Sequence, residues 1–158
     1  RHARLHAVEV VAHGEHLAAL VAHPEHLRGI DFLLLSHGHR DHMDKKSIRT
    51  IFNQNPSIKA LTPLGSGDVL RAIERRLPYQ EAGWYQQYDL DLPVTISFLP
   101  TRHWSRRGLS DTNKSLWGAF MIESQGKKIY FGGDSGYGKR RGAGNGHELV
   151  HDAPWVHS

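Results

Sequence analysis

The chain reads Ile30-Asp31-Phe32-Leu33-Leu34-Leu35-Ser36-His37-Gly38-His39-Arg40-Asp41-His42 across the stretch that decides its fold. The first half is a short apolar run, which is typical of a strand buried on both faces. The second half places three imidazoles and one carboxylate at H-x-H-x-D-H spacing. Imidazole and carboxylate are ligands for zinc and similar divalent ions. Because ligands in open α/β folds collect beyond the carboxyl ends of strands, the stretch predicts a metal site at the end of a buried strand.

Other histidine patterns are weaker, because 13 of the 158 residues are His and clusters arise by composition alone. Residues 12–17 and 22–27 are near copies with the pattern A-H-x-E-H-L, and we do not interpret them as metal sites. Residues 147–151 read H-E-x-x-H, the pattern that zinc peptidases place on a helix. Glycines precede this segment and Pro154 follows it. A helix there has room for only about two turns, so we disfavour a peptidase.

Length and composition indicate one domain with a buried core and no membrane span. A chain of 158 residues is of ordinary domain size. It has no run of 18 apolar residues, and its first residues lack the pattern of a signal peptide. We therefore expect a cytoplasmic protein. Cys is absent, so any metal must be held by nitrogen and oxygen ligands.

The formal net charge is +4, and much of the positive excess lies at Arg102, at residues 106–107 and at residues 139–141. A basic rim attracts an anionic substrate such as a phosphate ester, but the same residues also suit a solvated surface. The sequence leaves both interpretations open. A nucleic-acid-binding module is a further alternative. No recognition motif and no interleaved aromatic platform accompany the basic loops, so we expect no specific nucleic-acid partner.

The order of the expected elements predicts an α/β fold with a mixed sheet. Residues 7–20 suit either a helix or a strand, and residues 137–158 read as irregular. The first expected elements are a strand at 30–36, a helix at 45–55 capped by Asp44, and a strand at 58–61. A helix follows that is capped by Ser66-Gly67-Asp68, carries Val69, Leu70, Ile73 and Leu77 on one face, and stops at Pro78. The last expected elements are a strand opening near Gly83, a strand at 94–99, and a hairpin of 116–123 with 128–131 about Gln125-Gly126.

Residues of metal-ligand type follow three of these strands, after Leu35, after Leu99 and after Phe131. A catalytic zinc site needs about three protein ligands and an open position, and a pair of ions needs more ligands than one motif supplies. The candidate ligands are His37, His39 and His103 for one ion, Asp41 and His42 for a second, and Asp134 as a bridge. Glycines at 132, 133 and 136 let the backbone pass close to such a site.

The motif His37-Gly38-His39-Arg40-Asp41-His42, together with His103 and Gly133-Asp134-Ser135-Gly136, resembles the metallo-β-lactamase superfamily. Residues 100–109, with Asn113 and Leu116-Trp117-Gly118, are more specific. They resemble the branch that holds N-acyl-phosphatidylethanolamine-hydrolysing phospholipase D, with the ascorbate-6-phosphate lactonases nearby. The resemblance covers about residues 30–138 of a chain that we treat as a single domain, 1–158, and it leaves residues 1–29 and 139–158 unassigned.

The resemblance implies an αββα sandwich, one or two zinc ions, and hydrolysis by a metal-bound hydroxide. Manganese or iron would also suit a site of this kind. In the phospholipase branch the hydroxide attacks a phosphodiester, and in the lactonases it attacks a carbonyl, so we expect a small-molecule or lipid-like anionic substrate. His37, His39 and His103 would hold the first ion, the catalytic residues Asp41 and His42 the second, and Asp134 would bridge them. Residues 104–113 would wall the substrate, with Trp84 and Tyr85 adding apolar surface.

The resemblance also implies features that this chain does not show. Residues 1–29 lack the opening strands with a Gly-His pattern, and His147, His151 and His157 do not match the context of a last metal-binding His. We therefore expect an incomplete sandwich that lacks N-terminal strands and a C-terminal part. An alternative to the hydrolase is a truncated, catalytically weak metal-binding fragment. Exposed sheet edges invite pairing with another chain, so we expect a homo-oligomer.

Overall fold

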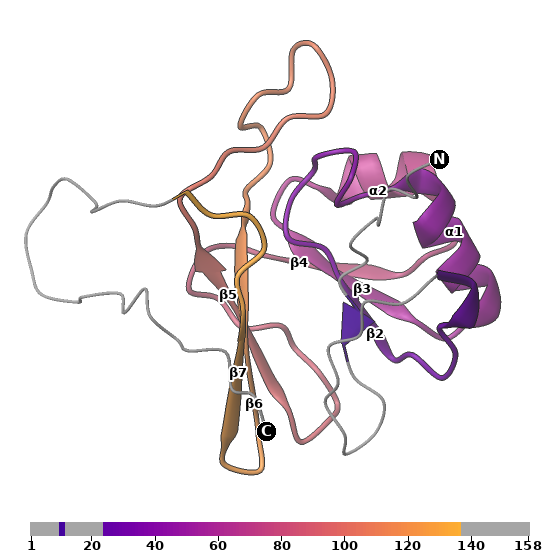
Figure 1. The fold of residues 1–158 in the computed structure, drawn as a ribbon, viewed down its shortest axis with the longest axis vertical. Coiled ribbons are helices and arrows are strands. Elements are labelled where there is room, and N and C mark those ends of the chain that lie inside the picture. The colour runs from indigo at the N-terminus through magenta and orange to yellow at the C-terminus, as the bar shows by residue number, and fades with distance from the viewer. Residues whose placement is uncertain (1–9, 12–23, 137–158) are drawn as a thin grey trace, which may run out of the picture.

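The computed structural model describes residues 10–11 and 24–136, which form two sheets and two α-helices arranged in layers (Figure 1). The first sheet has the strand order β1-β2-β3-β4, and the second has the order β5-β6-β7. The strands are β1 (Val10–Val11), β2 (Phe32–Leu34), β3 (Lys59–Pro63), β4 (Tyr79–Ala82), β5 (Thr95–Pro100), β6 (Gly118–Ser124) and β7 (Lys127–Phe131). The helices are the 3-10 turn η1 (Pro24–His26), α1 (Lys45–Gln54) and α2 (Gly67–Ile73).

The first sheet is built from two strand–helix–strand units. β2, β3 and β4 run parallel, while β1 pairs with β2 in the antiparallel sense. α1 connects β2 to β3, and α2 connects β3 to β4. Both helices lie on the side of this sheet that faces away from β5, β6 and β7 (Figure 1). Parallel strands need such crossovers, and a crossover helix covers one face of its sheet.

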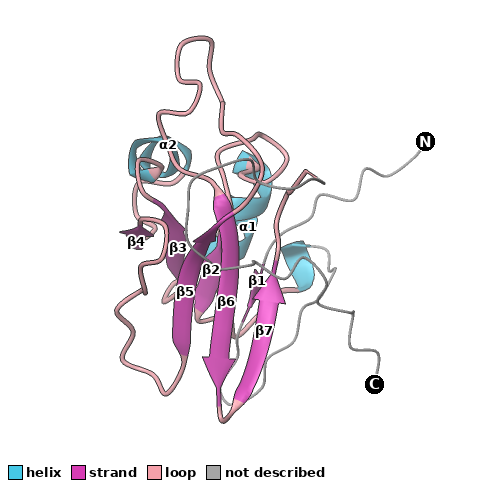
Figure 2. Cartoon of the chain, turned by 90° about the vertical axis from the view of Figure 1, so that its left-hand side faces the viewer, coloured by secondary structure: helices cyan, strands magenta, loops and turns pink. Residues whose placement is uncertain are grey.

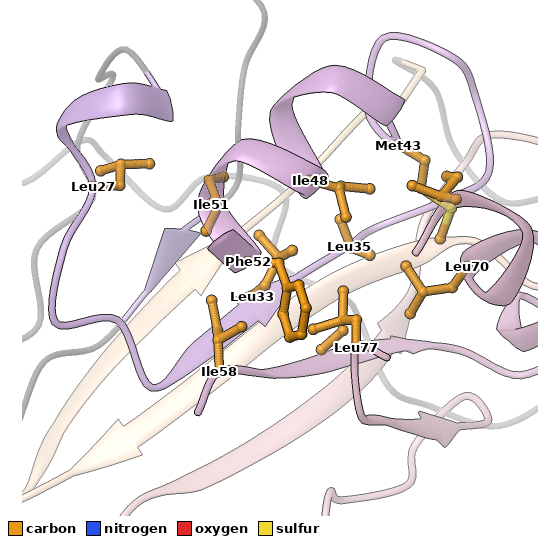
Figure 3. Packing of buried hydrophobic residues seen from close by; sticks show 12 residues of the cluster. Leu27, Leu33, Leu35, Met43, Ile48, Ile51, Phe52, Ile58, Leu70 and Leu77 are labelled. Atoms are coloured by element: carbon orange, nitrogen blue, oxygen red, sulfur yellow. The ribbon is translucent and has the colours of Figure 1, made fainter. Parts of the chain in front are cut away.

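β2 is buried on both faces, as its continuous apolar sequence predicts. Leu33 and Leu35 belong to the core between the sheet and the helices (Figure 3), where Ile48, Ile51 and Phe52 of α1 also pack. Phe32 and Leu34 belong to a second core, shared with Phe98 and Phe120 of the other sheet. One strand therefore anchors both halves of the structure, and the residues that follow it leave from the centre of the fold.

The second sheet is an antiparallel meander that packs against the first (Figure 2). Its β6–β7 turn has positive φ at Gln125 (49°) and Gly126 (76°), the backbone that a two-residue hairpin favours. The expected hairpin about these residues is confirmed. The layers run helix, sheet, sheet, which are three of the four layers of the expected sandwich. Within residues 24–136 no helix covers the outer face of β5–β7. None of the helices described there is long and apolar enough to cross a membrane.

Two expected boundaries are wrong, for local reasons. The strand expected to open near Gly83 lies earlier, at β4, directly after Pro78. α2 ends at Ile73, short of Leu77, although Leu77 is buried in the core as expected. The backbone N–H of Arg76 donates to the Glu74 carboxylate instead of continuing the helix. The expectations for residues 7–20, apart from Val10–Val11, and for residues 137–158 lie outside the described residues.

The N-terminus of α2 is capped from a neighbouring strand. Ser66 occupies the N-cap position, but its hydroxyl makes no capping hydrogen bond. The Gly67 N–H instead donates to the Glu81 carboxylate of β4 at 2.7 Å. The expected cap at Ser66-Gly67-Asp68 is confirmed in its position, but the capping bond comes from a carboxylate that is distant in sequence.

Asp44 caps α1, as expected, and this helix begins directly after the His cluster. The Asp44 carboxylate accepts from the Ser47 N–H and from the Ser47 hydroxyl, both at 2.8 Å. A tight turn joins the two features, because the Met43 N–H donates to the His39 carbonyl at 2.8 Å. The cap therefore fixes where the helix begins relative to His39.

We expect the substitution Asp44→Ala to lower the free energy of unfolding by about 1 kcal/mol, because the first turn of α1 loses its cap. Asp44→Asn should retain most of the stability, since Asn caps as well as Asp. Urea denaturation followed by circular dichroism measures both. Equal stability of the Ala and Asn variants would show that the cap does not stabilise α1.

Candidate metal centre

Backbone hydrogen bonds fix the loop after β2 where it enters the site. The Leu35 N–H donates to the Leu61 carbonyl at 3.0 Å, and the Gly118 N–H donates to the Ser36 carbonyl at 3.1 Å. His37 follows and is buried, with 1 % of its side chain exposed. Its Nδ1 lies 3.0 Å from the Ser36 hydroxyl oxygen. A proton on Nδ1 that is donated to Ser36 leaves the Nε2 lone pair directed into the site.

Three imidazole nitrogens converge on one point. His37 Nε2 lies 2.7 Å from His39 Nδ1. His103 Nε2, from the loop after β5, lies 3.2 Å from each of these two atoms. Asp134 Oδ2, from the loop after β7, lies 3.6 Å from His103 Nε2 and 3.9 Å from His37 Nε2. The four ligand atoms all lie within 4.8 Å of one another, so three strand ends meet here.

Hydrogen bonds alone do not satisfy this arrangement. Each of these three nitrogens is either an N–H donor or a lone-pair acceptor, so at least two of them are alike and their contacts cannot all be hydrogen bonds. His39 Nε2 is also buried without a hydrogen-bond partner. A zinc ion with Zn–N distances of about 2.0–2.1 Å places its ligand atoms about 3.3 Å apart. That spacing is close to the 3.2 Å between His103 Nε2 and its two neighbours, whereas the 2.7 Å between His37 Nε2 and His39 Nδ1 is shorter. The donor set of three imidazole nitrogens and one carboxylate oxygen therefore fits a zinc-like ion.

Asp41 and His42 lie beside this cluster. His42 Nε2 lies 3.3 Å from Asp134 Oδ2 and 3.9 Å from Asp41 Oδ2. The Asp134 carboxylate thus lies near both the three-histidine cluster and His42, and the His42 ring also packs on His37, with 4.2 Å between ring centroids. Asp41 is largely exposed, with 74 % of its side chain accessible, whereas His42 is 12 % exposed. All six residues expected from the sequence gather at this end of the molecule, and their individual roles stay predictions.

The surroundings of His37 and His39 favour their neutral form. Burial, together with the neighbouring His42, His39 and His103, lowers the pKa of His37 to about 3. Burial also lowers the pKa of His39, with His103 acting in the same sense and Asp41 opposing it. A protonated ring in this crowded space would have few water contacts and several positive neighbours. Neutral imidazole is the form that binds a metal ion.

Ser105 is a positioning residue that sequence reasoning missed. Its hydroxyl oxygen accepts from the Gly38 N–H at 3.3 Å and lies 2.8 Å from the Ser115 hydroxyl oxygen. Its own N–H donates to the Asn113 side-chain oxygen at 3.1 Å. This buried serine ties the loop that carries His103 to the loop that carries His37 and His39. A serine in a polar loop is an ordinary residue, so no sequence pattern singles it out.

Gly133 places Asp134. Its φ is +56°, and a Cβ at this position would lie 2.9 Å from the Ser36 Cβ, too close for any side chain. The Thr101 hydroxyl donates to the Asp134 carbonyl at 3.1 Å, which holds the next residue against the loop after β5. The expectation that glycine lets the backbone pass close to the site is confirmed at this position.

A groove of about 410 Å³ opens beside the cluster. The wall expected from residues 104–113 contributes Trp104, Arg106, Arg107 and Gly108, and the metal-binding loop contributes His39, Arg40 and Asp41. Trp104 packs edge-on against His39, with 4.4 Å between ring centroids. Burial, aided by the charge of Arg40, lowers the pKa of Arg107. Trp84, expected to add surface here, instead packs on Trp117 and donates to its carbonyl at 2.7 Å.

Comparison with known proteins identifies relatives of this chain. It is 32 % identical over 118 residues to the N-acyl-phosphatidylethanolamine-hydrolyzing phospholipase D 1 of Caenorhabditis elegans, an alignment that covers 70 % of this chain and 33 % of that protein. It is 34 % identical over 115 residues to the mitochondrial N-acyl-phosphatidylethanolamine-hydrolyzing phospholipase D of Saccharomyces cerevisiae, covering 69 % of this chain and 24 % of that protein. The chain therefore spans a third or less of the length of these two relatives.

The fold has a solved counterpart, and the family has a sequence model that matches nearly the whole chain. The crystal structure of a putative metal-dependent hydrolase from Parabacteroides distasonis superposes with a TM-score of 0.55 at 16 % identity, covering 81 % of this chain and 51 % of that one. The model of the beta-lactamase superfamily domain matches residues 8–152. The chain therefore belongs to the metallo-β-lactamase superfamily, in the branch of the N-acyl-phosphatidylethanolamine-hydrolysing phospholipases D.

Proposed function

We propose that this chain carries the metal-binding part of a zinc-dependent hydrolase that acts on a phosphodiester or a lactone. The observation that carries the proposal is the convergence of three imidazole nitrogens and one carboxylate oxygen within 4.8 Å, at the ends of three strands. Family membership supports it. The two phospholipase relatives are named for the hydrolysis of a phosphodiester lipid, which favours a phosphodiester as the first substrate to test.

Each residue has a distinct role in this proposal. His37, His39 and His103 hold a first ion, Asp41 and His42 hold a second, and the Asp134 carboxylate bridges the two sets. The distances support the bridge, because Asp134 Oδ2 lies 3.6 Å from His103 Nε2 and 3.3 Å from His42 Nε2. Manganese or iron could replace zinc, because imidazole and carboxylate sites accept several divalent ions.

The chemistry follows from the position of the cluster beside the groove. A bound divalent ion supplies Lewis acidity, which polarises a phosphoryl or carbonyl oxygen and lowers the pKa of water. The residues of the chain provide the rest. Asp41 lines the groove and is exposed, so its carboxylate is placed to take up a proton at the reacting centre. Ser105 and Gly133 hold the loops at a fixed spacing.

The cytoplasmic location and the homo-oligomeric state stay predictions. β7 pairs only with β6 among the described strands, and Ile129 and Tyr130 on it are partly exposed. That open edge supports oligomer formation by strand pairing. It is also compatible with the alternative of a metal-binding fragment that is catalytically weak, and turnover measurements separate the two.

We expect the protein purified without chelator to contain about one equivalent or more of zinc, manganese or iron. His103→Ala should lose most of it, because one of three imidazole ligands of the first set is removed. His26→Ala, at an exposed histidine in η1, is the matched control and should bind metal as the parent does. Elemental analysis measures the content. Less than about a tenth of an equivalent in the parent protein would reject the metal site.

We expect turnover of bis-p-nitrophenyl phosphate that falls about a hundredfold or more in Asp41→Ala, because a group placed for proton transfer contributes at least that factor. Asp68→Ala, at an exposed residue of α2 that pairs with Arg71, is the control. A γ-lactone tested in parallel decides between the two substrate classes. If the two variants hydrolyse the diester equally fast, Asp41 has no catalytic role.

We expect the metal-free protein to lose stability as the pH falls from about 6.5 towards 3. His37 has a pKa of about 3 in the folded chain and 6.5 as the ordinary value. Between these two pH values the unfolded chain therefore binds more protons than the folded chain, which favours unfolding. The contribution of neutral His37 to stability is complete only above about pH 6.5. Urea denaturation at pH 7 and pH 5 in the presence of chelator measures the effect. The pH dependence should be smaller in His37→Gln and unchanged in His26→Gln.

A further inference from the structure

The groove beside the metal centre carries an excess of positive charge. Its ionic side chains are three arginines, Arg40, Arg106 and Arg107, and one carboxylate, Asp41. Its lining combines two kinds of chemistry. His39 and Asp41 belong to the residues gathered at the metal centre, and the three arginines and Trp104 line the same groove. A molecule lying in the groove would thus meet the metal cluster and the guanidinium groups at the same time.

Contacts to the backbone hold the three guanidinium groups in place. Arg107 Nη1 donates to the Gly38 carbonyl at 3.3 Å, and Arg40 Nη2 donates to the Arg107 carbonyl at 3.5 Å. Arg106 Nε donates to the Gly108 carbonyl at 2.8 Å. The two loops that carry the arginines therefore brace each other. A guanidinium has five N–H donors, so these contacts leave most of the donor capacity of each group unused.

Among residues 24–136 no carboxylate forms a direct ion pair with Arg40, Arg106 or Arg107, whereas Arg71 pairs with Asp68 and Arg76 with Glu74. The charges of Asp44 and Asp111 act on Arg107 without such a contact. Asp111 is the acidic residue of the same loop, but its carboxylate accepts from the backbone N–H of Arg107 at 3.1 Å and of Gly108 at 2.8 Å. Three cations held in a groove without an ion-pair partner form a binding site for an anion.

We propose that Arg40, Arg106 and Arg107 form a subsite for a phosphate group that the substrate carries beside its reacting ester. That the bound molecule is a substrate rests on the proposed hydrolase function. That a phosphate group binds rests on the groove geometry alone. Guanidinium groups present paired N–H donors that match phosphate oxygens, and charge-assisted bonds of this kind are the strong ones. Trp104 gives the neighbouring part of the substrate an apolar wall. A substrate with no second anionic group would leave the arginines unmatched.

The phosphate group has two possible sources with the same chemistry, a soluble phosphate ester and a lipid headgroup. Equilibrium binding separates them and does not depend on turnover. The probes are glycerol 1-phosphate and vesicles of phosphatidylcholine that contain phosphatidic acid, each titrated into the purified protein. Binding of the soluble probe assigns the subsite to small esters, and binding of the vesicles alone assigns it to headgroups. Failure of both probes to bind would overturn the proposal even if the protein hydrolyses diesters.

The variants for this titration are Arg40→Gln and Arg106→Gln, both at exposed positions. Arg107 is less suitable, because it is half-buried and its bond to the Gly38 carbonyl holds the loop that carries His37 and His39. We expect each variant to bind the probe about tenfold more weakly, which corresponds to the loss of one charge-assisted hydrogen bond. Arg75→Gln, an exposed arginine beyond α2, should bind as the parent protein does. Equal affinity of all three variants would overturn the proposal.

Kinetics provides a second readout once activity is established. Two p-nitrophenyl phosphodiesters are compared, one of which carries a terminal phosphate on its alcohol. We expect the parent protein to show a lower KM for the phosphate-bearing ester, and the ratio of the two KM values to shrink about tenfold in Arg40→Gln. Arg40→Lys should restore part of the ratio, because Lys keeps the charge but not the paired donors. A ratio that is the same in the parent protein and in Arg40→Gln would contradict a role in substrate binding.

Discussion

Three imidazole nitrogens and a carboxylate oxygen are held together at the end of β2, and this crowding constrains the structure around them. Lone pairs that face one another repel unless a cation or a proton lies between them, and burial of His37 disfavours the proton. The scaffold must therefore hold groups together that would separate in water. Burial of β2 on both faces provides the anchor, because Leu33 and Leu34 sit in two different cores.

The other strands contribute the remaining contacts around the same site. The Ser36 carbonyl accepts from Gly118 at the start of β6, so the two sheets are joined directly beside His37. Gly133 lies against Ser36 at a distance that admits no side chain, and this contact brings Asp134 to the cluster. The Ser105 hydroxyl oxygen accepts from the Gly38 N–H and so joins the loop after β5 to the loop after β2. Each of these contacts joins residues that are distant in sequence, so the site and the packing of the two sheets depend on each other.

The sequence predicted the fold class and which residues lie together, but not the exact place of every element. The H-x-H-x-D-H spacing and the placement of His103 and Asp134 after strands identified the residues that gather in space, because ligand chemistry restricts the residue types so strongly. Strong local signals also worked, as at Asp44, where an acidic residue precedes an amphipathic helix. β4 was misplaced because its residues do not alternate between apolar and polar, and its position is set by pairing with β3. The Glu81 cap and the Ser105 contacts were not predictable, because tertiary contacts alone bring those partners together.

The charges around the site link the metal and the groove. Asp41 and Asp134 are exposed carboxylates at the cluster, and in the absence of a cation they would repel an anionic molecule entering beside them. The arginines lie along the same groove and attract such a molecule. A divalent cation among the imidazoles would offset the negative charge of both carboxylates. The metal centre and the arginines would then both attract an anion. Because neutral imidazoles add no positive charge of their own, the anion affinity of the groove depends on whether the cluster holds its ion.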